Sequence, residues 1–369
     1  MDQSRRWPRV ASWPPHQIAL AAVGIALGTI PGLPKVVINP QLILSLFVPA
    51  LVFRAALTLD RGALRSVAGS VALLALAGVA ISIATVATLA HTVAQLTWAN
   101  AFLLGAILSP TDPIAVAAVI RQGRAPARLG ALLEGESLFN DAVGVVAYSA
   151  ALAAIAGTTR GLPSVGLDLI RLTLIGLAVG LVVGWAGNRL AQRLRGQRWE
   201  VAATTLAAYA SYGLALYLGG SAIVAVVVAG IAMAQGEAEG DQVRGWWSSL
   251  ERILSIALFL LIGIGLPARG VGSHIVEVLL AFLFLLLARL LPVHLFALQM
   301  SRRWRLLIWW GGLRGALPVA LALASGVVPG VDPKVPLLAY GVVALSLLVQ
   351  GASLGPITTW LTSSSEGTA

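Results

Sequence analysis

The sequence predicts a polytopic membrane protein built entirely of α-helices. Of its 369 residues, 58% are hydrophobic and only 11% are charged. The mean hydropathy of +0.88 lies above that of soluble globular domains of this length. Apolar runs long enough to cross about 30 Å of hydrocarbon recur about twelve times. Together these observations exclude an ordinary soluble domain.

The expected membrane spans follow one another with short connections. We predict them at 17–33, 40–59, 65–90, 97–120, 129–156, 165–188, 201–218, 221–235, 246–267, 274–298, 304–328 and 336–361. The residues before the first span are basic and rich in proline, and no small-residue cleavage site follows it, so we expect this span to be retained. The sequence therefore predicts a basic N-terminus at 1–16, one transmembrane domain at 17–361 and a short C-terminal tail at 362–369.

The basic residues predict the orientation of the chain. We count the basic residues that lie between the spans or close to a span end. If the N-terminus is cytoplasmic, 17 of them lie on the cytoplasmic side and 5 lie on the opposite side. This positive-inside bias predicts a multi-pass protein of the cell (inner) membrane with both termini in the cytoplasm. It also explains the net charge of +10 better than nucleic-acid binding does, because the basic residues form short clusters between apolar runs.

Motifs of catalysis are missing from the sequence. It has no cysteine, which excludes thiol chemistry, and no phosphate loop, nucleophile elbow or dinucleotide fingerprint. We therefore expect neither an enzyme nor a cofactor.

Two of the predicted spans contain helix-breaking residues at their centres. In 97–120, the segment Ser109-Pro110-Thr111-Asp112-Pro113 places two prolines three residues apart. In 304–328, the segment 311–318 combines three glycines and a proline around Arg314. Broken helices at membrane depth line cavities, and a matched pair in two halves of a chain indicates a transport site. Because the two spans are seven apart in order, they run in opposite directions, which predicts inverted repeats with two crossed discontinuous helices.

Six ionisable residues fall within the predicted spans at membrane depth. They are the cations Arg54, Arg289 and Arg314 and the acids Asp112, Glu136 and Asp141. A charge in the bilayer is costly and therefore indicates function, and the equal numbers predict mutual pairing in a polar interior. For Arg54 and Arg289 the alternative is a side chain that reaches the membrane surface from a span end. Asp112 and Arg314 have the signs that neutralise the ends of broken helices.

The segment 134–141 carries the polar stripe expected of an ion site. Glu136, Ser137, Asn140 and Asp141 lie at positions i, i+1, i+4 and i+5, on one face of a helix. Carboxylate and hydroxyl oxygens are the ligands that hard cations prefer. Burial favours the protonated form of a carboxylate and a bound cation favours the ionised form, so one aspartate can exchange a cation for a proton.

Three segments of this sequence resemble a known family. Residues 109–113, 135–141 (Gly-Glu-Ser-Leu-Phe-Asn-Asp) and 310–316 (Trp-Gly-Gly-Leu-Arg-Gly-Ala) look like the signatures of the NhaP/NHE type of sodium/proton antiporter, in the monovalent cation/proton antiporter superfamily. Three ordered motifs are far more specific than one. The resemblance covers nearly the whole membrane domain and implies an NhaA-like antiporter fold.

The resemblance also implies a role for each residue of these motifs. Asp141 matches the carboxylate that binds Na⁺, Li⁺ or protons, and Thr111 and Ser137 match its neutral oxygen ligands. Glu136 and Asn140 match the pair that shapes the site from behind, while Asp112 and Arg314 match the charges at the helix crossing. The uncharged Asn140 implies electroneutral exchange of one cation for one proton. The resemblance also implies a homodimer in the lipid bilayer. In each protomer a transport bundle, here including 97–156 and 274–361, would move against a scaffold made of the remaining spans.

One position departs from the family pattern. An acid normally follows the phenylalanine of the second span, but here Arg54 follows Phe53. Arg54 can form an ion pair with Asp112 or Glu136, which would leave Asp141 free to bind an ion. It can also pair with Asp141 itself, which would displace sodium. We expect Arg54 to pair with an acid other than Asp141. The alternatives to Na⁺/H⁺ exchange are a K⁺/H⁺ antiporter and a transport-incompetent relative that acts as a sensor or partner.

A glycine repeat marks the sixth predicted span. Gly176, Gly180 and Gly184 recur at every fourth residue, which lets another helix approach closely. We favour packing inside the protomer over a dimer seam.

Overall fold

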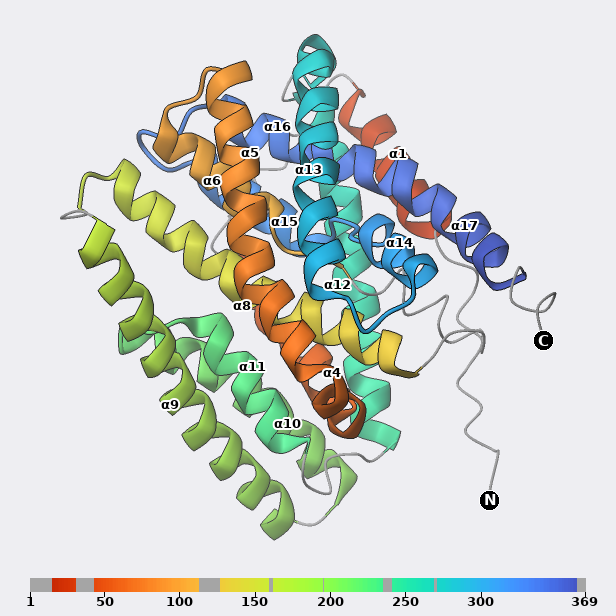
Figure 1. Ribbon diagram of the computed structural model, residues 1–369. Helices are drawn as coiled ribbons and strands as arrows, with labels where there is room; N and C mark the ends of the chain where they lie inside the picture. Colours follow the sequence, from red (N-terminus) through yellow and green to blue (C-terminus); the bar gives the residue numbers. More distant parts are fainter. Residues whose placement is uncertain are drawn as a thin grey trace.

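The computed structural model describes residues 15–30, 43–112, 127–158, 162–194, 196–234, 241–268 and 271–363. Every regular element in these ranges is helical (Figure 1). Among the described residues, five helical stretches are long and apolar enough to cross a membrane, and four shorter apolar helices accompany them. Each of the twelve predicted spans contains helix among its described residues. The number of crossings stays a prediction, and most of the expected terminal segments (1–14 and 364–369) lie outside the described residues.

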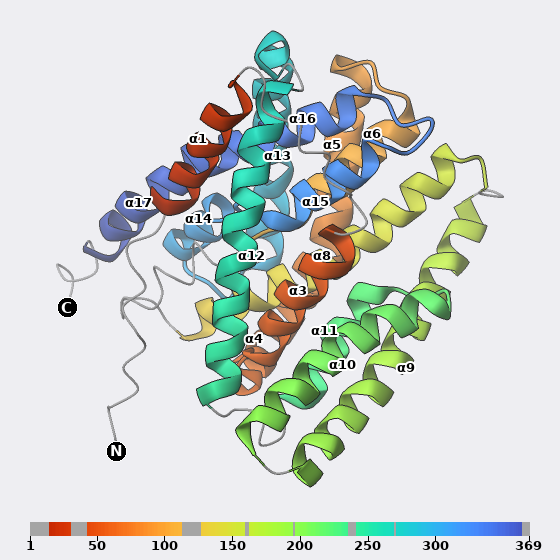
Figure 2. The ribbon, with the colours of Figure 1, turned by 180° about the vertical axis from the view of Figure 1, so that it is seen from behind.

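A first group of helices comes from the start and the middle of the chain. Its members are α1 (Pro15–Gly28), the π-helical turn η1 (Ile43–Phe47) with α3 (Val48–Leu57), α9 (Leu162–Leu194), α10 (Gln197–Tyr217), α11 (Ala222–Met233) and α12 (Asp241–Ala268). Helices α9, α10 and α11 lie side by side, α3 packs on α11 and α12, and α1 packs along α12 (Figure 2).

A second group holds both broken spans. Its members are α4 (Arg61–Leu73), η2 (Leu74–Gly78), α5 (Val79–Val93), α6 (Trp98–Leu108), α8 (Ala127–Ile155), η4 (Val271–His274), α13 (Ile275–Phe296), α14 (Arg302–Trp310), α15 (Ala316–Ser325), α16 (Lys334–Leu345), η5 (Ser346–Gly351) and α17 (Ala352–Ser363). Helix α8 packs on α4 and α6, while α13 packs on α5 and α16. The expected division placed the span 65–90 in the scaffold, whereas α4, η2 and α5 pack with α8 and α13 in the second group. The division into scaffold and transport bundle stays a prediction.

Local sequence fixes where several helices begin. Side-chain oxygens of Asp60, Thr97, Ser221 and Ser301 accept hydrogen bonds from first-turn amides of α4, α6, α11 and α14. Such caps satisfy amides that have no partner within the helix. This matters in a membrane, where no water is available to bind them.

Both predicted helix breaks are present. Helix α6 ends at Leu108, directly before Ser109-Pro110, and α14 ends at Trp310, six residues before α15 begins at Ala316. The prolines and glycines that predicted the breaks lie within or beside these unwound segments. Two irregular segments therefore sit inside an otherwise helical bundle.

The glycine repeat packs within the protomer. A Cβ atom built on Gly176, Gly180 or Gly184 would lie 2.5–2.7 Å from atoms of α11 or of Ser221, the residue that caps it. Glycine at these positions lets α9 lie against α11 at close range. The expected internal packing is confirmed for this face of α9.

Candidate functional site

The two unwound segments cross and bind each other through the backbone. The amide of Asp112, after α6, donates a hydrogen bond of 2.7 Å to the carbonyl of Leu313, between α14 and α15. Segments about 200 residues apart in the sequence therefore meet at one point. One amide and one carbonyl freed by the breaks thus satisfy each other, as a backbone without access to water requires.

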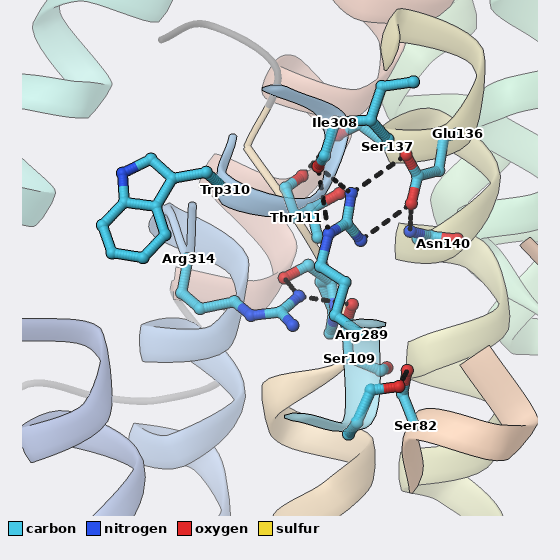
Figure 3. A network of polar contacts seen from close by, with 12 residues as sticks. Ser82, Ser109, Thr111, Glu136, Ser137, Asn140, Arg289, Ile308, Trp310 and Arg314 are labelled. Carbon is cyan, nitrogen blue, oxygen red and sulfur yellow. Dashed lines mark hydrogen bonds and ion pairs between the residues drawn. The ribbon is translucent and has the colours of Figure 1, made fainter. Parts of the chain in front are cut away.

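Arg314 binds the end of α6 at this crossing. Its Nη1 donates to the carbonyls of Ser109 at 2.8 Å and Pro110 at 2.9 Å, and its side chain lies in the buried network of Figure 3. The residue is only 2% exposed. These carbonyls follow the C-terminus of α6, where the helix dipole is negative. The guanidinium thus lies where a positive charge is favourable.

Asp112 lies at the opposite kind of helix end. Its carboxylate contacts Gly315, the residue before the first turn of α15, so that a Cβ atom at 315 would lie 2.8 Å from the Asp112 Cγ. The N-terminus of a helix is positive and favours an acid. Glycine is needed at 315 because a larger residue would displace the carboxylate.

Arg289 of α13 joins α8 to the end of α14. Its guanidinium forms a two-pronged ion pair with Glu136, with N–O distances of 2.8 and 3.1 Å, and donates to the carbonyl of Ile308 at 3.1 Å (Figure 3). Arg289 is 7% exposed and Glu136 is 2% exposed. The alternative in which Arg289 reaches the membrane surface is therefore wrong. A bidentate pair is the arrangement in which two buried charges compensate each other best.

The remaining stripe residues of α8 face the unwound segment of the fourth span. The Ser137 hydroxyl donates to the carbonyl of Thr111, and both residues are buried. Asn140 Nδ2 donates to Glu136 at 3.4 Å. Asp141 lies one turn beyond Ser137 in α8 and is partly exposed, and its carboxylate has no hydrogen bond or ion pair with the other described residues. Asp112 and Arg314 are near enough to act on it electrostatically.

Arg54 has a partner that the sequence reasoning did not include. Its guanidinium forms an ion pair with Glu251 of α12, and the exposed fractions of the two side chains are 22% and 17%. The predicted pairing of three cations with three acids is wrong, because Arg54 binds an acid outside that set and Arg314 binds carbonyls. Counting charges within spans does not reveal that α3 packs on α12.

The sequence reasoning also missed two residues of the network. Ser346 Oγ accepts a hydrogen bond of 3.0 Å from the Arg314 amide and donates to Gln350, whose Nε2 donates to the Trp310 carbonyl at 2.8 Å. Both residues are almost fully buried, in the π-helical η5. The available signal was a serine and a glutamine four residues apart in an apolar span. From η5, which follows α16, these two residues bind backbone groups at both ends of the unwound segment between α14 and α15.

Known proteins are similar to this chain in sequence and in fold. The Na⁺/H⁺ antiporter ApNhaP of Aphanothece halophytica is 32% identical over 356 residues, covering 92% of this chain and 68% of the relative. The Na⁺/H⁺ antiporter NhaH of Halobacillus dabanensis is 31% identical over 366 residues, covering 93% and 91%. The solved structure of the sodium proton antiporter MjNhaP1 from Methanocaldococcus jannaschii superposes with a TM-score of 0.79 at 20% identity, covering 94% of this chain and 92% of that one.

The fold and the family follow from these comparisons. The match to MjNhaP1 identifies the fold as that of the NhaA-like antiporters. The family described as sodium/hydrogen exchanger, transmembrane, matches residues 12–360, nearly the whole sequence. This integral membrane protein therefore belongs to the sodium/hydrogen exchanger family.

Proposed function

We propose that this chain exchanges Na⁺ or Li⁺ for H⁺ across the membrane, with Asp141 as the group that carries either ion in turn. One observation carries the assignment to Asp141. Of the two acids on the α8 stripe, Glu136 is bound to Arg289, while Asp141 has no such partner among the described residues. An acid that is already paired gains little from a cation, whereas an unpaired one beside a helix crossing is available to bind it.

Oxygen atoms around Asp141 suit a small alkali cation. The Ser137 hydroxyl donates a hydrogen bond to the Thr111 carbonyl, so the lone pairs of its oxygen remain available to a cation. The Thr111 hydroxyl and the unwound backbone would supply further oxygens. Hard cations such as Na⁺ and Li⁺ prefer this ligand type. Glu136, Asn140 and Arg289 would shape the site from behind, and Asp112 and Arg314 would hold the crossing.

Competition at one carboxylate would couple the two ions. If a proton and a cation cannot occupy Asp141 together, alternating access makes the exchange obligatory. Asn140 adds no charge at the neighbouring position, so one cation would exchange for one proton. The transport step would move the group with the broken helices against the other helices, in a homodimer of the inner membrane with cytoplasmic termini.

A K⁺/H⁺ antiporter and a sensor without transport are less well supported. The relatives described above are both named Na⁺/H⁺ antiporters. The sensor alternative was motivated by Arg54 standing in place of an expected acid, and the charge of Arg54 is paired with Glu251 rather than with Asp141. One result would still favour the sensor: no flux with any alkali cation between about pH 5 and 9 in the natural protein, and flux in Arg54→Glu.

The decisive variant is Asp141→Asn. We expect it to abolish sodium-driven and lithium-driven proton flux in everted vesicles while the protein still folds, because an amide keeps the shape but binds neither ion. The control is Asp168→Asn, the same change at an exposed residue near the start of α9, which should leave the flux unchanged. Sodium-driven flux retained by Asp141→Asn would show that another group carries the ions.

A further inference from the structure

Helix α9 presents an apolar face to the outside of the protein. The helix lies at the edge of the molecule in both ribbon views (Figures 1 and 2). Its glycines pack on α11, so the opposite side of the helix points outward. That side carries Leu174, Val182 and Trp185, each of which is more than half exposed. Because α9 contains the candidate membrane span Gly166–Leu194, this outer face is suited to contact with lipid chains.

The outer face of α9 ends in a basic patch, which we define as Arg189, Arg193 and Arg198. Arg189 and Arg193 lie one turn apart near the end of α9, and Arg198 lies in the first turn of α10. All three are exposed, and none forms an ion pair with a described acid. The sequence of 185–200 contains four arginines and a single acid, Glu200. The end of this span therefore carries an excess of positive charge that the chain itself does not neutralise.

An aromatic contact orders one of these arginines. The guanidinium carbon of Arg189 lies over the ring of Trp185, 5.1 Å from its centroid. This cation–π contact holds a long side chain that would otherwise be free in solvent. Tryptophan is common at the ends of membrane spans, at the level of lipid headgroups. Because a side chain that is already ordered loses less entropy on binding, Arg189 is prepared for an anion at this level.

We propose that the basic patch and the outer face of α9 together bind an anionic phospholipid, with the headgroup against the arginines and the acyl chains along the apolar face. Residues four apart on a helix have Cβ atoms about 5–6 Å apart, so one phosphate group can contact both Arg189 and Arg193. Arg198 adds a third positive charge, and clusters of arginine at a span end attract anionic lipids. A second copy of this chain fits less well, because a two-fold axis would bring the same arginines against one another. This surface is independent of the proposed exchange activity.

Native mass spectrometry of the purified full chain tests the proposal. The protein is titrated with phosphatidylglycerol, which is anionic, and with phosphatidylcholine of the same acyl chains, and the bound lipid is counted. We expect tighter binding of phosphatidylglycerol. The variant Arg189→Gln/Arg193→Gln/Arg198→Gln should weaken that binding by about a hundredfold, roughly fivefold for each arginine, and leave phosphatidylcholine binding unchanged. Equal binding of the two lipids by the natural protein would overturn the proposal.

A second triple variant removes the same charge from other parts of the protein. Arg252→Gln/Arg302→Gln/Arg303→Gln changes three exposed arginines on α12 and α14. It should bind phosphatidylglycerol nearly as well as the natural protein does. Equal losses in the two triple variants would mean that the lipid responds only to net charge, and the assignment to α9 would be wrong.

A tryptophan variant tests the patch without changing any charge. Trp185→Leu removes the contact that orders Arg189 and should weaken phosphatidylglycerol binding by about two- to fivefold. The matched control is Trp199→Leu, at an exposed tryptophan of α10 that makes no cation–π contact with a described arginine. The control should bind as the natural protein does. If Trp185→Leu also binds unchanged, the arginines act as diffuse charge and the proposed site is overturned.

The same spectra distinguish a lipid from a protein partner, because they report how many copies of the chain are in each assembly. If the triple variant of the basic patch changes that number while phosphatidylglycerol binding is unaffected, the patch is a contact between copies and the lipid proposal is wrong. If the triple variant does not fold, Arg189→Gln alone decides: a loss of about fivefold supports the site, and unchanged binding overturns it.

Discussion

Among single residues, the arginines determine which of the two acids on the α8 stripe has an ion-pair partner. Arg289 holds Glu136, and Arg54 holds Glu251. Arg314 binds carbonyls, so it strengthens the end of α6 without an ion pair to Asp141. Each of these arginines therefore binds a partner other than Asp141. The charge of Arg54 is compensated between α3 and α12, which leaves the Asp141 carboxylate without an ion pair among the described residues.

Exchanging the charges of Arg54 and Glu251 tests this compensation. In Arg54→Glu two carboxylates face each other, and the free energy of unfolding should fall by about 1–3 kcal/mol. The double variant Arg54→Glu/Glu251→Arg restores opposite charges and should recover most of that loss in a double-mutant cycle. Additive effects of the two changes would mean that the pair contributes nothing to stability.

At this scale the sequence predicted the residue types better than their partners. Asp112, Glu136, Asp141, Arg289 and Arg314 were all expected at membrane depth, and the structure gathers them around one crossing. The partner of Arg54 was wrong because a pairing between distant helices depends on their packing, which no local pattern contains. Glu251 stands beside Arg252 near a span end, where charges are ordinary.

Among the helices, the sequence predicted breaks and close approaches. Prolines and glycines act on the backbone of their own segment, so their effect is readable without knowing the neighbours. The unwound segments at 109–112 and 311–315 are examples. The π-helical turns η2 and η5 were not predicted, because their residues have no such local signal and depend on the surrounding packing.

The α9–α11 contact offers a matched pair of glycine variants. In Gly180→Ala the new Cβ would lie 2.7 Å from the Val228 Cβ, so α9 and α11 must separate, and we expect a loss of about 1–3 kcal/mol in the free energy of unfolding. In Gly213→Ala, within α10, no atom lies within 4 Å of the new Cβ. That variant should be as stable as the natural protein or more so, since alanine favours helix. Equal melting temperatures for the two variants would mean that α9 can shift away from α11 freely.

At the scale of the whole molecule, polar contacts join the helices that meet at the crossing. A backbone hydrogen bond joins Asp112 to Leu313. Arg314 binds the end of α6, and Arg289 of α13 binds the end of α14. We therefore expect α6, α14 and α15 to move together. In contrast, the Arg54–Glu251 pair lies within the other group of helices. This distribution of strong polar contacts fits a transport step in which one group moves against the other.

The last prediction concerns the whole transport cycle, because it measures how the two ions share one site. If protons and sodium compete for Asp141, the sodium concentration that gives half-maximal exchange should rise about tenfold for each unit of pH below the point at which Asp141 takes up its proton. Above that point it should be independent of pH. The measurement is proton flux against sodium concentration at several fixed pH values, with Asp168→Asn as the control that keeps the same slope.

The slope separates the possible mechanisms. A tenfold change per pH unit corresponds to one proton competing with one cation, which is the electroneutral exchange proposed from Asn140. A change of about a hundredfold per unit would require a second titrating group in the same competition, and Asp112 would be the first residue to test. A half-maximal concentration that does not change with pH would mean that sodium and protons bind at separate sites. In that case obligatory exchange would need a coupling device other than Asp141.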